Sequence, residues 1–344
     1  MVNGDNGQVG LGLVGLGWWG GELARAAETS EVARVVTCFA RDQSSRGEFA
    51  SAHRCRPASS LEELLSDPEI EGVLIATSHL SHRDLVEQTA AAGKHVFVEK
   101  PLTTTVADGR ACVQAATDAG VILQVGHQSR RTAANRRIKE MLDAGEIGDV
   151  EIVVAHQSTT SGFRLPDEAW RWSPEQSPLG SMTSLGVHKI DTMHYLIGPI
   201  ARVSALSRAG REHPIDEATV LAFEFENGAL ATLTTSFFIP VVNQIAVFGT
   251  LAAAFNTMGG SRLSVQRRDA SEPTNVELTP VDPVVDEIVG FARAIRGEGP
   301  IEPDGEAALA VIAVLEAAVE SVKTGRAVDV VEGGHHDGLT PQPT

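Results

Sequence analysis

The chain has 344 residues, of which 42% are apolar and 21% are charged, and its formal net charge is −17 at pH 7. This composition is that of a folded globular protein, and the length suffices for two domains. The negative charge excludes a nucleic acid or an anionic membrane as the main partner, because phosphate groups bind to clustered basic surfaces. No apolar run in the sequence reaches the roughly 18 residues that a membrane span needs.

The three cysteines, Cys38, Cys55 and Cys112, lie far apart, and their spacing is not that of metal ligands. Such a set is typical of a reducing compartment. The first residues, "MVNGDNGQ", lack the basic and apolar segments of a signal peptide. We therefore expect a cytoplasmic protein without a bound metal.

The first part of the chain, residues 8–125, alternates apolar strands with helices. This pattern predicts a parallel sheet covered on both faces, and thus a doubly wound α/β domain. A capping box at Ser60 and Glu63 predicts the start of one helix, and Gly93 closes another. The strands lie within 8–17, 32–40, 72–78, 95–100 and 120–127, and the helices lie within 19–28, from Ser60, 82–93 and 106–119.

The pattern changes after about residue 149. Residues 217–238 alternate apolar and polar side chains, and Asn227 with Gly228 predicts a type I′ hairpin turn. With the other strands this predicts an open, mostly antiparallel sheet in an α+β domain. The strands lie within 149–157, 217–238, 243–256 and 261–268, and the helices lie within 132–144, 184–197, 282–299 and 304–325.

These two patterns divide the chain into an α/β domain, residues 1–127, and an α+β domain, residues 128–332. The helix 132–144 would link them, and we expect the tail, residues 333–344, to be disordered. An antiparallel sheet with alternating apolar residues exposes one face unless another element covers it. We therefore expect a homodimer or homotetramer that is joined through this sheet.

The segment "VGLGWWG" contains the pattern Gly15-x-Gly17-x-x-Gly20 between a strand and a helix. The first glycine permits a tight turn, the second lets a pyrophosphate approach the backbone, and the third lets helix and strand pack closely. The helix N-terminus then offers amide donors and a positive dipole to the phosphates. We expect this loop to bind a dinucleotide, and the alternative is a glycine-rich turn without a ligand.

The end of the second strand carries the residues that distinguish NAD from NADP. An acid at this place binds the ribose 2′-hydroxyl of NAD, whereas an arginine accommodates the 2′-phosphate of NADP. Arg41 comes first here and Asp42 follows it, so the order favours NADP over NAD.

The segment "HVFVEKPL", residues 95–102, is a buried strand that ends on Glu99, Lys100 and Pro101. A surface turn with two solvated charges would explain it. Alternatively, Lys100 is held at the carboxyl edge of the sheet, where open α/β sheets bind their ligands. A basic run nearby fits the start of an amphipathic helix better than an anion site. It consists of Arg130, Arg131, Arg136 and Arg137.

The chain resembles the Gfo/Idh/MocA family, named after glucose–fructose oxidoreductase and inositol dehydrogenase, over about residues 8–331. The resemblance rests on "GLGWWG", "AAGKHVFVEKPL", "GHQSRR", "PLGSMTSLGVHKIDTMHYLIG" and "VVDEIVGFARAIRGEGPIEPDGEAALAVIAVLEAA". It implies an N-terminal Rossmann domain and hydride transfer between NAD or NADP and a sugar, a sugar derivative or a cyclic polyol. Two alternatives stay open: a dihydrodiol or deoxy-sugar dehydrogenase or reductase, and a nucleotide-binding sensor that has lost catalysis.

The resemblance implies that Lys100 projects toward the nicotinamide and the reacting hydroxyl, and that Glu99 orients it. The segment "SLGVHKID" matches the family's Asp-x-x-x-His-x-x-Asp, with Ser184 in place of the first acid. His188 is then the expected general base, because imidazole transfers protons near neutral pH. Asp191 would orient the imidazole from the next turn, while the serine cannot supply the missing charge.

Residues 159–180 form a long irregular loop before the His188 helix, and such loops often carry specificity. Its aromatic and basic residues suit a pyranose or cyclitol ring, although packing between the domains explains Trp170 and Trp172 equally well. The expected catalytic residues are Lys100, His188 and Asp191. The expected substrate-binding residues are Lys100, His127, Arg164, Trp170, Arg171, Ser184 and His188. The expected cofactor-binding residues are Gly15, Gly17, Trp18, Trp19, Gly20, Arg41, Asp42, Thr77, His82, Glu99 and Lys100.

Overall fold

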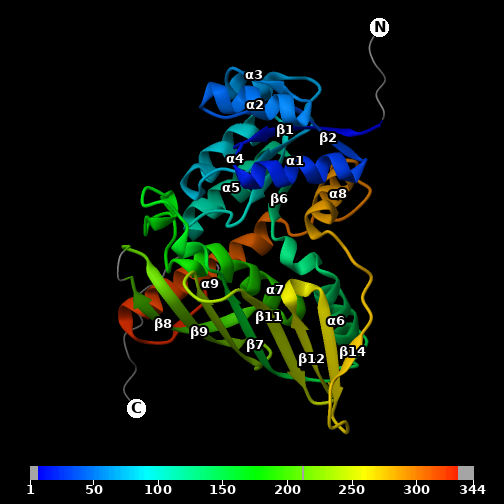
Figure 1. Ribbon diagram of the computed structural model, residues 1–344, viewed down its shortest axis with the longest axis vertical. Helices are drawn as coiled ribbons and strands as arrows, with labels where there is room; N and C mark the ends of the chain where they lie inside the picture. The colour runs from blue at the N-terminus through cyan, green and yellow to red at the C-terminus, as the bar shows by residue number, and fades with distance from the viewer. Residues whose placement is uncertain (1–6, 211–212, 332–344) are drawn as a thin grey trace.

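The molecule consists of a six-stranded sheet with its helices and a nine-stranded sheet with its own (Figure 1). The computed structural model describes residues 7–210 and 213–331. The tail that the sequence predicts to be disordered, residues 333–344, lies outside these ranges. The parallel α/β domain and the mostly antiparallel second sheet are both confirmed.

All strands of the first sheet run parallel, in the order β3-β2-β1-β4-β5-β6. The order reverses between β1 and β4, and doubly wound sheets bind ligands at the carboxyl ends of the strands at such a switch point. The strands are β1 (Val9–Val14), β2 (Ala33–Phe39), β3 (Arg56–Pro57), β4 (Gly72–Ile75), β5 (His95–Glu99) and β6 (Leu123–Gly126). The helices between them are α1 (Trp18–Ser30), α2 (Gln43–His53), α3 (Leu61–Ser66), α4 (His82–Ala91) and α5 (Val106–Ala119).

Two apolar layers enclose the first sheet. Leu74 and Phe97 point into the layer that contains α1, whereas Ile75 and Val98 point into the opposite one. This alternation is the period of two that a strand imposes on its side chains. Helix α2 has no counterpart in the sequence prediction, because its polar sequence buries too few side chains to give a periodic pattern.

Helix α8 (Pro283–Ile295) comes late in the chain but packs on the first sheet. The Phe291 ring lies against Phe97, with 5.7 Å between the ring centroids, and it also covers Gly72, which leaves room for the ring because it lacks a side chain. The sequence division at residue 127 had assigned this helix to the second domain. Its apolar face instead completes the core of the first domain.

The second sheet has the order β14-β13-β12-β11-β7-β10-β9-β8-β15, and only β7 and β10 pair in parallel. Its strands are β7 (Val150–Ser158), β8 (Ile200–Ala209), β9 (Asp216–Phe225), β10 (Leu230–Ser236), β11 (Val242–Gly249), β12 (Ala252–Thr257), β13 (Arg262–Arg267), β14 (Thr274–Val276) and β15 (Val328–Asp329). The sequence prediction had missed β8, β14 and β15.

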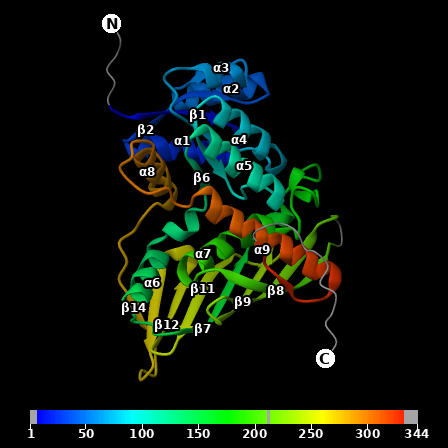
Figure 2. The same cartoon turned by 180° about the vertical axis from the view of Figure 1, so that it is seen from behind.

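Three helices cover the face of the second sheet that is turned toward the first domain, as the two opposite views show (Figures 1 and 2). They are α6 (Ala133–Asp143), α7 (Val187–Ile197) and α9 (Gly305–Thr324). Helix α9 packs on α5 as well, where Val106 N donates to the Glu316 carboxylate at 2.9 Å. It thereby joins the two domains. None of the helices in the described ranges is long and apolar enough to cross a membrane.

The turn between β9 and β10 differs from the prediction. A type I′ turn needs positive φ angles at both central residues, but of Asn227 and Gly228 only Gly228 has one, at +86°. Gly228 N donates to Phe225 O at 3.0 Å, and Phe225 N donates to Ala229 O at 2.9 Å. The connection is therefore a three-residue loop, residues 226–228, in which the glycine takes the left-handed position.

The turn between β1 and α1 depends on two glycines. Gly15 has a φ of +95°, which favours glycine, and a Cβ there would lie 2.4 Å from Ala76 O. A Cβ on Gly20 would lie 2.2 Å from Gly15 O, so the start of α1 can approach the turn only with a glycine at this position. Gly21, the next residue of the helix, has open space where its Cβ would be.

We expect Gly20→Ala and Gly21→Ala to change stability in opposite directions. Gly20→Ala forces backbone atoms apart and lowers the free energy of unfolding by about 1–3 kcal/mol. Gly21→Ala raises it by about 0.5–1 kcal/mol, because alanine loses less entropy in a helix. Urea titration of the two variants without cofactor measures the difference. Equal effects would contradict the tight packing of α1 on the turn.

Candidate active site

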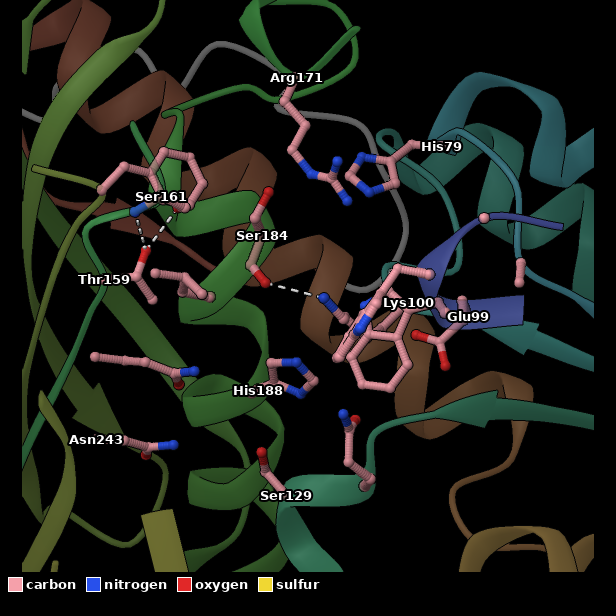
Figure 3. A pocket seen from close by; sticks show the side chains of 18 of the residues that line it. His79, Glu99, Lys100, Ser129, Thr159, Ser161, Arg171, Ser184, His188 and Asn243 are labelled. Atoms are coloured by element: carbon pink, nitrogen blue, oxygen red, sulfur yellow. Dashed lines mark hydrogen bonds between the residues drawn. The ribbon is translucent and has the colours of Figure 1, made fainter. Parts of the chain in front are cut away.

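A cavity of about 940 Å³ lies between the carboxyl ends of the first sheet's strands and the helix-covered side of the second sheet (Figure 3). The β1–α1 turn, the ends of β4 and β5, the loop 159–180 and the segment that precedes α7 all contribute to its wall. A cavity of this size at a topological switch point is a typical place for a cofactor and a small substrate.

The β1–α1 turn forms one end of this cavity. A Cβ on Gly17 would meet no atom within 4 Å, so a ligand can approach the backbone there. Within the described part of the chain, no side chain caps the N-terminus of α1, and its first amides are available to an anion. Trp18 and Trp19 line the cavity beside Gly17. These residues fit the pyrophosphate of a dinucleotide.

Arg41 and Asp42 follow β2 and are not among the cavity-lining residues. The Asp42 carboxylate accepts from Ser45 N at 2.8 Å and from Ser45 Oγ at 2.6 Å, and thus caps α2. These bonds hold the pKa of Asp42 below its usual value. The Arg41 side chain is exposed and has no hydrogen bond or ion pair with other described residues. The Asp42 carboxylate is therefore already used as a helix cap, whereas the Arg41 guanidinium is available to bind a ligand.

Two histidines follow β4, and they have different surroundings. Both ring nitrogens of His82 face backbone oxygens, of Pro101 at 2.9 Å and of Thr77 at 3.2 Å, and the residue is fully buried outside the cavity lining. His82 thus links the ends of β4 and β5, whereas the sequence analysis had expected it to contact the cofactor. Thr77 lines the cavity. So does His79, whose Nδ1 lies 2.6 Å from Gln176 O.

Lys100 connects the two domains inside the cavity. Its Nζ donates to Ser184 O at 3.0 Å, across 84 residues of sequence (Figure 3). Ser184 belongs to a π-helical turn (Met182–Gly186) that precedes α7, and such turns are frequent at functional sites. Its hydroxyl oxygen is buried and has no partner among the described residues. The contact with Lys100 is thus made by the serine backbone.

Glu99, the neighbour of Lys100, is buried in the cavity wall, and neither carboxylate oxygen finds a hydrogen-bond donor in the described ranges. Burial raises its pKa to about 7, although Lys100 opposes the shift. Glu287 of α8 has the same lack of partners, and burial together with Glu99 raises its pKa well above the usual value. Burial lowers the pKa of Lys100.

His188 lines the same cavity as Lys100, although the two belong to different domains (Figure 3). Burial, together with the charges of Lys100 and His127, lowers its pKa well below 6.5, so its imidazole is neutral at pH 7. The His127 ring lies perpendicular to it, with 6.1 Å between centroids. Both nitrogens of His127 are buried without partners in the described structure, and His127 itself lies behind the cavity lining.

Asp191 does not contact the His188 imidazole that the sequence analysis expected it to orient. Its carboxylate is fully buried and accepts from Arg130 Nε at 2.9 Å and from Arg130 Nη2 at 2.5 Å. The other arginines of the basic run also pair with acids, Arg131 with Asp286 and Arg136 with Glu302. The run is therefore structural, because it links the segment after β6 and the start of α6 to α7, to α8 and to the segment between α8 and α9.

The loop 159–180 contributes aromatic and basic side chains to the cavity. Trp170, Arg171 and Arg164 line it, and the Arg171 guanidinium stacks on the Trp170 ring, 4.4 Å from its centroid. Trp172 is instead buried in the loop, where its Nε1 donates to Pro166 O. Trp172 thus packs within the second domain, whereas Trp170 lines the cavity and also contacts His79 of the first domain.

Several polar groups of the cavity are not among the site residues that the sequence analysis named. Three amide oxygens are buried there without hydrogen-bond donors among the described residues, and they can accept hydroxyl protons of a ligand. They belong to Gln128, Gln157 and Asn243. Gln157 and Asn243 are paired neighbours on β7 and β11. Gln157 lies near the end of β7, Asn243 near the start of β11 and Gln128 just after β6, so no common sequence pattern marks them.

Comparison with known proteins finds two family models that match successive parts of the chain. Residues 9–127 match the oxidoreductase family with an NAD-binding Rossmann fold, and residues 135–254 match the GFO/IDH/MocA C-terminal domain. The chain is 30% identical to D-xylose 1-dehydrogenase (NADP(+)) 2 of Haloferax volcanii, over 93% of this chain and 98% of that protein. It is 26% identical to 1,5-anhydro-D-fructose reductase of Ensifer adhaerens, over 94% of this chain and 98% of that protein.

A crystal structure of a putative NADPH-dependent oxidoreductase from Desulfitobacterium hafniense superposes with a TM-score of 0.90 and 33% sequence identity. The match covers 94% of this chain and 98% of that chain. The two family models follow one another along the chain, and the relatives match it over nearly its whole length. The chain belongs to the Gfo/Idh/MocA family of NAD(P)-dependent oxidoreductases.

Proposed function

We propose that the protein transfers a hydride between a nicotinamide cofactor and a CH–OH group of a sugar, a sugar derivative or a cyclic polyol. The observation that carries the proposal is that Lys100 and His188 line one cavity with the glycine turn, although they come from different domains. The names of the relatives support the substrate class, since they include a xylose dehydrogenase and an anhydrofructose reductase.

The residues of the β1–α1 turn would hold the cofactor pyrophosphate, through the open backbone at Gly17 and the amides of Trp18 and Trp19. With its pyrophosphate held at this turn, the cofactor would supply a hydride acceptor in one direction and a hydride donor in the other. Glu99 and Thr77 line the cavity beyond this turn and complete the proposed cofactor site.

His188 is the proposed general base. Its neutral imidazole takes the hydroxyl proton when the substrate is oxidised and returns it when a carbonyl is reduced. Lys100 stabilises the negative charge that develops on the same oxygen, and its bond to Ser184 O fixes the direction of the ammonium. Asp191 is assigned a positioning role, because its ion pair with Arg130 holds α7, the helix that carries His188. The His127 ring packs against the His188 ring, so we assign His127 to holding His188 in place rather than to substrate contact.

We expect Lys100→Ala and His188→Ala each to lower kcat/KM by about 100-fold or more. Each variant removes a group that stabilises the oxygen charge or accepts the hydroxyl proton in the transition state. Lys139→Ala is the matched control, since Lys139 pairs with Asp143 on the surface. Absorbance of the reduced nicotinamide measures the rates over a panel of sugars and polyols. A loss of less than about threefold for Lys100→Ala, under 1 kcal/mol of barrier, would contradict the proposal.

The pH dependence of oxidation tests the role of His188 separately. A base must be deprotonated to act, and the pKa of His188 lies well below 6.5 because of burial and the nearby cations. The rate should therefore stay constant as the pH falls toward 6.5 and decline only below it. An acid limb centred above 6.5 that His188→Ala leaves in place would show that another group is the base.

We propose NADP as the preferred cofactor, because Arg41 is available while Asp42 is engaged as a helix cap. NADPH should bind about tenfold more tightly than NADH, and Arg41→Ala should remove most of this difference because it removes the partner of the 2′-phosphate. Dissociation constants from fluorescence titration measure both effects. A tenfold advantage for NADH would overturn the preference.

Ser184 is the feature that favours the sensor alternative, since it replaces the acid of the family pattern. The same substrate panel separates the two functions. Tight cofactor binding without turnover of any sugar, polyol, dihydrodiol or deoxy-sugar would identify a sensor, and turnover excludes it. A location in the cytoplasm stays a prediction from the sequence.

We also propose that the protein forms a homodimer or homotetramer through the outer face of the second sheet. Among the residues described, no helix covers this face, and it carries a cross-strand pair of exposed apolar side chains, Leu206 and Val220. Ile152, Val154 and Leu230 extend the apolar area over β7 and β10. Such an area favours association with a partner.

Light scattering at micromolar concentration should give the mass of a dimer or tetramer, and the double variant Leu206→Asp, Val220→Asp should give a lower mass, because buried carboxylates oppose association. Leu80→Asp is the control, because Leu80 is an exposed apolar residue of the first domain and does not belong to the second sheet. A monomeric mass for the unmodified protein would refute the proposed assembly.

A further inference from the structure

The guanidinium of Arg171 has a position in the cavity that the proposed chemistry does not use. Its side chain extends from the loop 159–180 into the cavity beside His79 (Figure 3). It is partly buried, yet no oxygen of the described residues accepts a hydrogen bond from it, and its guanidinium stacks on the Trp170 ring. A guanidinium carries five donors, and groups in such surroundings are normally paired.

The loop holds this arginine in place before any ligand binds. Trp172, the residue that follows, stacks on the His213 ring at 3.8 Å between centroids and is buried with Phe237. Trp170, the residue before it, packs edge-on against His79 of the other domain at 4.6 Å. Arg171 is thus fixed from both sides, and a fixed donor loses little entropy when it binds a ligand.

The charge of the cavity points in the same direction. Among the residues that the structure describes, three cations line it, Lys100, Arg164 and Arg171, and the only carboxylate on its wall is that of Glu99. The chain as a whole has a net charge of −17, so this balance is local to the cavity. Burial raises the pKa of Glu99 to about 7, so its carboxyl group is only partly ionised near neutral pH and the cavity keeps an excess of positive charge.

We infer that Arg171 binds a carboxylate of the substrate, and that the natural substrate is a sugar acid rather than a neutral sugar. The planar fork of a guanidinium matches the two oxygens of a carboxylate. Phosphate groups, in contrast, commonly use helix N-termini, and the start of α1, which also lines this cavity, is the proposed site of the cofactor pyrophosphate. This inference rests on the proposed function, since it names the substrate class of the same site.

The test compares acids with their neutral counterparts: D-glucuronate with D-glucose, D-galacturonate with D-galactose, and D-gluconate with D-glucitol. Dissociation constants are measured by calorimetry on the full chain in the presence of NADP. We expect at least one acid to bind about tenfold more tightly than its neutral partner, and added salt to weaken it. Arg171→Met should lower this acid-to-neutral ratio by about tenfold. Arg171→Lys should restore part of it, because the charge remains while the fork is lost.

Arg268→Met is the control. Arg268 directly follows β13, is exposed and does not line the cavity, so the variant removes the same charge at another place. A ratio that is the same in the unmodified protein and in Arg171→Met would overturn the inference. So would tighter binding of D-glucose 6-phosphate than of any acid, or a loss in Arg171→Met that affects NADPH instead of the acid.

Turnover in the same panel separates this inference from the proposed function. If a neutral sugar reacts and no acid is preferred, the inference fails and the dehydrogenase remains. If an acid binds through Arg171 and nothing reacts with either cofactor, the anion site remains and the proposed hydride transfer fails.

Discussion

The hydrogen bond from Lys100 Nζ to Ser184 O is the interaction on which the candidate site depends. It joins the end of a strand in the first domain to the turn before α7 in the second, and His188 follows one helical turn later. Because the donor and the imidazole come from separate domains, the site exists only while the domains stay packed. Helix α9 and the Arg131 and Arg136 ion pairs with α8 and with Glu302 maintain that packing.

The electrostatics of the site follow from its burial. Burial, together with the charge of Lys100, lowers the pKa of His188 well below 6.5, and burial raises the pKa of Glu99 to about 7. A neutral imidazole beside an ammonium is a combination that can remove a hydroxyl proton and stabilise the resulting oxygen charge. Ser184 adds no charge to this arrangement. Its backbone keeps the lysine in place, so the family's first acid is not needed for that contact.

Local signals predicted much of this fold. Asp304 and Gly325 mark the two ends of α9, and the predicted helix 106–119 coincides with α5, because caps and glycines act on their nearest neighbours. The sequence did not reveal β8, because Leu206 is apolar but faces outward and the inward residues Ala205 and Ser207 are small, so the alternation is weak. It also missed that Asp191 binds Arg130, 61 residues away, and that the His82 ring links the ends of β4 and β5. Tertiary packing determines such contacts, and neither the spacing of residues on a helix nor the order of the strands predicts it.

The central claim is that Lys100 and His188 act on the same reacting oxygen, and a double-mutant cycle on kcat/KM tests it most directly. The account predicts that Lys100→Ala and His188→Ala are strongly non-additive, so that the second change costs much less once the first has been made. Fully additive losses, as expected for two residues that act at independent places, would contradict it.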